Sequence, residues 1–222
     1  MSGLIGRPGI TDWEVAEELL YGARDFFSSA EHAFDSRGYD AAAENVRRYR
    51  SGRGGLEEYS DAEIARHPAL LDAEDANRTR FETQTFTGRT RNSTLNAELL
   101  GTPDGASRRF GDDWDLAVPW SQPSTYLAFG GTSVTSRGEF SAHRSGDVLT
   151  IRGVVGHGFG LKEVFDFHAS QPGGREAAML EGVGEAAPFQ MACDRHQDVE
   201  AELRFEPDGS LTLRRATWGA IR

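Results

Sequence analysis

The chain has little cysteine, no long hydrophobic run and a deficit of positive charge. Cys193 is the only cysteine among 222 residues, which excludes a disulfide within the chain. No run approaches the roughly 18 apolar residues that a membrane-spanning helix needs. Lysine and arginine number 24 against 35 aspartate and glutamate, a formal net charge of −11. Because nucleic-acid binding requires a basic surface, that function is disfavoured.

Several catalytic signatures are also missing. The sequence contains no Gly-x-Ser-x-Gly, no phosphate-binding P-loop, no Gly-x-Gly-x-x-Gly opening a helix and no His-Glu-x-x-His. It has no cysteine and histidine cluster with the spacing of a zinc site. Residues 1–10 are too short and too interrupted by glycine and proline for an export signal. We therefore expect other machinery to carry the chain if it acts outside its producer.

Helical patterns dominate residues 11–88. Thr11 and Glu14 have capping-box spacing, and apolar residues from Trp13 to Phe27 recur every three or four positions. Further helices are predicted from Asp40 to the glycines at 52–55 and over residues 69–80, with a second capping box at Ser60 and Glu63. Residues 81–87 alternate like a strand, and residues 89–113 are interpreted as a long polar loop.

Strand patterns begin at residue 114. Two hairpins are predicted, one from residues 132–143 and 148–155 and one from residues 199–205 and 211–213. A strand is expected over residues 125–129, and a short helix over 174–183. The predicted fold is α+β, with a helical subdomain (1–88) packed on an antiparallel, partly open β-barrel domain (89–222).

Titratable groups gather in Glu163-Val-Phe-Asp-Phe-His-Ala-Ser170. On a strand Asp166 and His168 share a face, whereas Glu163 reaches them only at a bend or bulge. His157 precedes this stretch. A lone histidine is more often structural, but four titratable groups within twelve residues can bind a metal or move a proton. Arg175 follows a Pro-Gly-Gly turn at a helix start, where it either binds a phosphate or is simply solvated.

The order and spacing of several phrases resemble the colicin M family of bacteriocins. Tyr49-Arg-Ser-Gly-Arg-Gly54 is similar to the family's Tyr-x-x-Gly-x-Gly phrase at a helix end. Thr132–Gly138, Asp147–Val155 and Glu163–Ser170 resemble its Gly-containing strand, its hairpin and its Asp-x-Tyr-Asp-Phe stretch. The resemblance runs over residues 41–205. It departs from the family at Glu163, at Phe165, and at Pro172-Gly173, where the family has a His-Arg pair.

The resemblance implies a toxin that hydrolyses lipid II between undecaprenyl and pyrophosphate in the periplasm of a target bacterium, at the membrane surface and with Mg²⁺. Asp166 and Glu163 would hold the metal, and Asp166 could instead act as base. His168, or His157 in its place, would transfer the proton, and Arg175 would bind pyrophosphate. A type VI secretion system is the expected delivery route, and a cognate immunity protein is an expected partner.

Two other functions are consistent with the sequence. The absence of the His-Arg pair at residues 172–173 is also consistent with a toxin of the same fold that has another target or only a binding role. The acidity of the chain is consistent with an immunity or adaptor protein that covers a basic toxin.

Overall fold

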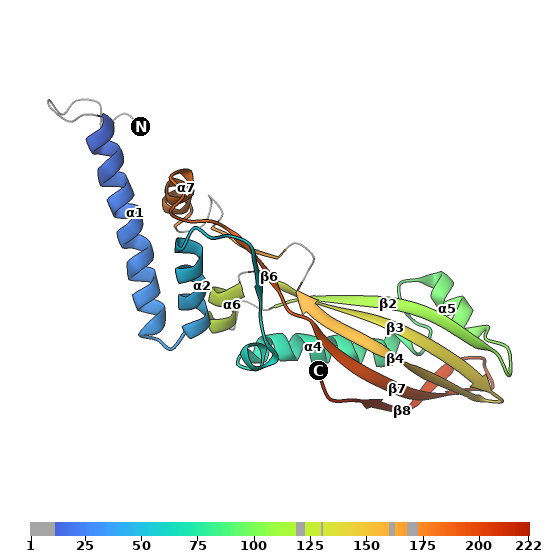
Figure 1. The fold of residues 1–222 in the computed structure, drawn as a ribbon. Coiled ribbons are helices and arrows are strands. Elements are labelled where there is room, and N and C mark those ends of the chain that lie inside the picture. The colour runs from blue at the N-terminus through green and yellow to red at the C-terminus, as the bar shows by residue number, and fades with distance from the viewer. Residues whose placement is uncertain (1–11, 119–122, 130, 160–162, 168–172) are drawn as a thin grey trace. The chain divides into compact units, whose positions relative to one another are not determined.

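The computed structural model of the chain describes residues 12–118, 123–129, 131–159, 163–167 and 173–222 (Figure 1). These residues form two compact units that are interleaved in the sequence. The first unit comprises residues up to 57 with residues 127–130 and 164–190, and the second comprises residues 58–126, 131–163 and 191–222. Residues 58–88 thus belong to the unit that contains the main sheet. The predicted cap at Thr11 lies outside the described residues.

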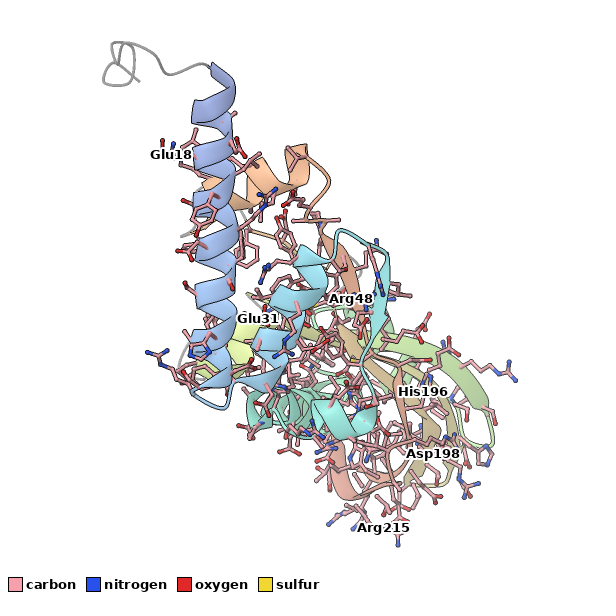
Figure 2. All side chains as sticks on the ribbon, turned by 60° about the vertical axis from the view of Figure 1, so that its left-hand side comes forward. Glu18, Glu31, Arg48, His196, Asp198 and Arg215 are labelled. Carbon is pink, nitrogen blue, oxygen red and sulfur yellow. The ribbon has the colours of Figure 1, made fainter. Side chains whose placement is uncertain are left out.

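The first unit contains the helices α1 (Asp12–Asp35), α2 (Asp40–Arg50) and α7 (Gly174–Gly182). Glu31 of α1, labelled in Figure 2, ties α1 to α2, since it accepts from Arg47 Nε and Arg50 Nη1, both at 2.9 Å. A small sheet has the strand order β1 (Leu56–Glu58), β6 (Phe189–Ala192), β5 (Val164–Phe165). The predicted helices over residues 40–50 and 174–183 are confirmed.

An aromatic cluster forms the core of the first unit. Phe27 and Tyr49 are fully buried and meet at a ring separation of 5.6 Å. Phe167 lies edge-on to both, at 4.9 Å from Phe27 and 5.1 Å from Tyr49. Phe165 stacks on Phe189 at 5.1 Å. These rings therefore join α1, α2 and the small sheet, because each element contributes at least one of them.

The glycine phrase that ends α2 permits a close backbone approach. Gly52 and Gly54 have φ of 66° and 56°, the left-handed region in which glycine is unstrained. A Cβ on Gly52 would lie 2.7 Å from the carbonyl oxygen of Gly184. The Ala187 N–H can therefore donate to Tyr49 O at 2.9 Å. The predicted end of the helix at these glycines is confirmed.

The second unit contains a five-stranded antiparallel sheet with the order β2-β3-β4-β7-β8. Its strands are β2 (Ser107–Ala117), β3 (Ser133–Ser145), β4 (Val148–Phe159), β7 (Arg195–Phe205) and β8 (Leu211–Trp218). Both predicted hairpins are confirmed. Within the described residues β2 and β8 are the edges of an open sheet, so the fold is α+β and the barrel is not closed.

One face of this sheet, the inner face, is covered by α4 (Pro68–Arg80), the π-helix η1 (Phe81–Thr85) and α5 (Ser93–Leu100). The short helix α3 (Asp61–Ile64) precedes α4 and begins at the predicted capping box of Ser60 and Glu63. The opposite, outer face carries the polar positions of each strand. The predicted helix over residues 69–80 is confirmed as α4.

The strand predicted over residues 81–87 is wrong. Phe81 and Phe86 are both fully buried, and their rings lie 5.5 and 5.2 Å from that of Phe140. Residues five apart on a strand point to opposite faces, whereas the π-helix places both rings on one side. The hydrogen bond from Phe86 N to Phe81 O, at 2.8 Å, closes this turn.

Two further predictions are corrected. Residues 89–113 are not a loop, because α5 and the start of β2 lie within them. Residues 125–129 form part of α6 (Pro123–Phe129), not a strand. Pro123 is the first residue of α6, a position where proline is tolerated because its missing N–H has no helical partner.

A short hydrogen-bonded chain attaches η1 to the sheet. Trp114 Nε1 donates to Thr85 Oγ1 at 2.9 Å, and Thr85 Oγ1 donates to Asp112 Oδ2 at 2.5 Å. Thr85 is fully buried. Burial raises the pKa of Asp112 more than the bond from Thr85 lowers it. The threonine hydroxyl therefore satisfies two polar groups that would otherwise be buried without partners.

We expect Thr85→Val to lower the free energy of unfolding by about 1–3 kcal/mol, because the indole N–H and the Asp112 carboxylate lose their shared partner. Denaturant-induced unfolding followed by tryptophan fluorescence measures the change. Thr83→Val is the matched control, since the Thr83 hydroxyl donates to Thr79 O in an exposed turn. An equal loss of unfolding free energy in both variants would contradict the role given to the Thr85 hydroxyl.

Candidate functional site

Asp166 is an exposed carboxylate on an aromatic support in the first unit. It follows β5 between Phe165 and Phe167, whose rings pack 5.5 Å apart in the cluster around Tyr49. The Tyr49 hydroxyl donates to Glu181. Burial, this hydrogen bond and the nearby charges of Glu181 and Asp166 raise the Tyr49 pKa, so the phenol stays protonated at neutral pH.

Arg175 lies in the first turn of α7, in the same unit, and its side chain is exposed. It makes no ion pair with the part of the chain that the structure describes. Gly173 caps this helix with a φ of 86°, and a Cβ there would lie 2.5 Å from the ring of Phe26. The close approach to Phe26 therefore requires glycine at the start of α7.

Glu163 and His157 belong to the second unit. The Glu163 Oε1 accepts a hydrogen bond from the Ser133 N–H at 3.1 Å, and its carbonyl accepts from Met191 N at 3.0 Å. The predicted group is thus divided, with Asp166 and Arg175 in one unit and Glu163 and His157 in the other. His168 lies outside the described residues. The catalytic roles of all five residues stay predictions.

His157 faces the inner side of the sheet and is only 1% exposed. Its Nδ1 lies 2.8 Å from Ser136 Oγ, which also accepts from Asn77 Nδ2 at 3.0 Å. Nε2 has no hydrogen-bond partner among the described residues, although Gln197 lies near enough to raise the pKa slightly. Burial, together with the charges of Arg78 and Arg195, outweighs that effect and lowers the pKa to about 4.

A buried ion pair lies beside this imidazole. Arg195 Nη1 donates to Glu74 Oε1 at 2.6 Å, and the two side chains are 6% and 3% exposed. Arg195 Nε also reaches Asp61 at 3.0 Å. Burial raises the pKa of Glu74 despite the opposing effect of Arg195. This pair joins α4 to β7.

The described residues do not form a ready metal site. No three or more histidine, cysteine, aspartate or glutamate side chains converge among them. Asp166 and Glu163 lie in different units, and Glu163 already accepts from a backbone N–H. The magnesium requirement, with Asp166 and Glu163 as the ligands, stays a prediction. No helix among the described residues has the length and apolar character to cross a membrane.

The outer face of the sheet holds polar residues that the sequence analysis did not combine. His196 Nε2 lies 2.9 Å from Asp194 Oδ1. Arg137 of β3 and His196 of β7 flank Gly156 of the intervening strand β4. The signal in the sequence was the pair Gly156 and Gly158, two residues apart just after the strand predicted over residues 148–155, because glycine near a strand indicates a close approach to the backbone.

No protein-family model and no curated protein matches the chain. The comparison with solved structures gives low-scoring matches. PaeM, a colicin M-like bacteriocin produced by Pseudomonas aeruginosa, gives a TM-score of 0.36 at 14% identity, over 71% of this chain and 50% of its own. Pectocin M2 gives 0.35 at 12% identity, over 88% and 64%. The chain thus spans less than two thirds of the length of either protein.

The pKa of His157 predicts an acid-sensitive fold. Because the folded-state pKa is lowered from 6.5 to about 4, the unfolded chain binds the proton first as the pH falls. The stability is complete above pH 6.5 and is lost as the pH falls toward 4, by roughly 3 kcal/mol. We expect His157→Gln to flatten this part of the curve of unfolding free energy against pH. The exposed His143→Gln is the control, and a curve unchanged by His157→Gln would refute the assignment.

Removing one partner of the buried ion pair has a predictable cost. We expect Glu74→Gln to lower the free energy of unfolding by roughly 3–5 kcal/mol, because the Arg195 charge stays buried without its main partner. Asp61→Asn should cost about 1 kcal/mol or less, since the Asp61 side chain is half exposed. Urea unfolding of both variants measures the difference, and equal effects would argue against a dominant role for Glu74.

Proposed function

We propose that this chain is an antibacterial toxin that hydrolyses lipid II or a related polyprenyl pyrophosphate in the periplasm of a target bacterium. The observation that carries the proposal is the meeting, in one unit, of two phrases that resemble the colicin M family. Tyr49, which opens the first phrase, lies 6.3 Å from the ring of Phe165 and 5.1 Å from that of Phe167, in the second. Asp166 lies between these two phenylalanines.

The geometry of the first unit leaves the carboxylate of Asp166 accessible to solvent. Its neighbours Phe165 and Phe167 point into the aromatic cluster, while its own side chain is exposed. A carboxylate held on a rigid support is suited to a reaction that depends on the position of a proton acceptor. Arg175, exposed in the first turn of α7, has a guanidinium able to bind phosphoryl oxygens.

In the proposed reaction Asp166 accepts a proton from a water molecule as its oxygen attacks the phosphorus next to the lipid. The new bond joins water oxygen to phosphorus, and the bond between phosphorus and the undecaprenyl oxygen breaks. The leaving oxygen takes up a proton, so that undecaprenol and a pyrophosphoryl product result. Arg175 neutralises charge on the phosphoryl oxygens. Bound Mg²⁺ would supply further neutralisation of that charge.

The decisive assay incubates the protein with lipid II, with and without Mg²⁺, and measures undecaprenol by chromatography. We expect Asp166→Asn to lower the rate by roughly a hundredfold or more, because the proton acceptor is lost. Asp25→Asn, which removes an exposed carboxylate of α1, is the matched control. Absence of undecaprenol from the folded wild-type protein under both conditions would sink the proposal.

A growth assay separates the alternatives. The chain is directed to the periplasm of a susceptible bacterium, and lysis is scored. Lysis that survives Asp166→Asn points to a toxin with another target or a binding role, and unaffected growth points to an immunity or adaptor protein. A cognate immunity protein, delivery by a type VI secretion system and contact with the membrane through the lipid substrate belong to the same proposal.

A further inference from the structure

A trough of about 470 Å³ crosses the outer face of the sheet in the second unit. Gly156 and Gly158 of β4 form its floor, so the central strand presents backbone where other residues would present side chains. A Cβ on Gly156 would lie 3.2 Å from His196 Nδ1, and one on Gly158 would lie 2.9 Å from Cys193 O. Glycine at both positions thus lets the His196 ring and the Cys193 carbonyl lie close to the backbone of β4, where they border the trough.

The two walls of the trough differ in charge. The wall at β3 carries both Arg137 and Glu139, whereas the opposite wall carries Asp194 beside His196. Arg137 of β3 is exposed and forms no ion pair within the described ranges, although Asp113 faces it across the β2–β3 ladder. On the other wall, Asp194 and His196 hold each other at 2.9 Å (Figure 2 labels His196). Two strand spacings separate the walls, roughly 9–10 Å between backbones.

Contacts on the inner face of the sheet fix the position of the trough wall at β7. Arg195 points to the inner face, where its guanidinium is bound to Glu74. Because alternate residues of a strand point to opposite faces, His196 must then point outward, and its Nε2 lies 2.9 Å from Asp194 Oδ1. The backbone of His196 is also paired with Arg222 in both directions, at 2.8 and 3.0 Å. The backbone of His196 is therefore positioned before any ligand arrives.

The mixture of charges indicates the ligand. Glu139 lies two residues from Arg137 on the same wall and is also exposed without an ion pair among the residues described. A polyanion would be repelled by Glu139 and Asp194, and a simple cation would be repelled by Arg137. A ligand with one carboxylate and one ammonium group satisfies both walls, and the volume falls within the range of small-molecule sites. Burial raises the pKa of the Cys193 thiol to about 12, so the cysteine adds no charge at neutral pH.

We propose that this trough binds a short peptide with free ends. The carboxylate of the peptide is held by the fork of Arg137, and its ammonium by Asp194 and the Nδ1 of His196. This site uses residues of the second unit alone and does not depend on the proposed action of Asp166.

Titration of the full chain with tri-alanine, followed by the backbone amide signals of Gly156 and Gly158 in NMR spectra, tests the site. We expect tri-alanine to shift these signals, and we expect its N-acetylated and its C-amidated forms to bind about tenfold more weakly. Arg137→Gln should abolish the difference between the free and the amidated peptide. Asp194→Asn should abolish the difference between the free and the acetylated peptide.

The controls lie on the same face of the sheet. Arg109→Gln on β2 and Glu200→Gln on β7 remove exposed charges away from the trough and should leave all affinities unchanged. Unshifted signals up to roughly 20 mM tri-alanine would overturn the proposal, as would stronger binding of inorganic pyrophosphate than of the peptide at these glycines. Since the measurement is of binding, a failure of lipid II hydrolysis leaves its outcome unaffected.

Discussion

Arg195 of β7 and Glu74 of α4 form an ion pair in the interior of the second unit. Either charge would strongly destabilise the fold if it were buried there without its partner. The pair fixes the rotation of the start of β7, since a guanidinium that points inward sends the adjacent residues outward. Arg195 also contributes to the low pKa of His157, and Glu74 contributes to the high pKa of Cys193. The inner polar cluster and the outer trough are thus two consequences of one buried contact.

The first unit depends on aromatic packing. Phe27, Tyr49, Phe167 and Phe165 come from segments far apart in the sequence, and their rings hold those segments together. The same packing leaves Asp166 as the polar residue between two anchored neighbours. The glycines after α2 are necessary for this arrangement, because a side chain at Gly52 would collide with the backbone at Gly184.

Local patterns predicted much of the fold. The capping box at Ser60 and Glu63 and both hairpins of the main sheet are confirmed, because short-range hydrogen bonds and strand alternation determine them. The segment from Phe81 was predicted wrongly because the alternation within residues 81–87 was given more weight than the five-residue spacing of Phe81 and Phe86, which a strand would place on opposite faces. Only the position of Phe140 decides that Phe81 and Phe86 must point the same way.

At the candidate site, too, some features follow from the sequence and others depend on the tertiary structure. The sequence by itself identified Asp166 and the titratable residues around it, the glycine phrase after α2, and an acidic chain with an α+β pattern. The tertiary structure alone decided that His157 is enclosed, that Tyr49 lies beside Phe165 and Phe167, and that Arg137 and His196 share a trough. The physical reason is that residue type and spacing set local geometry, whereas burial and the meeting of distant charges depend on which faces the packed elements turn toward one another.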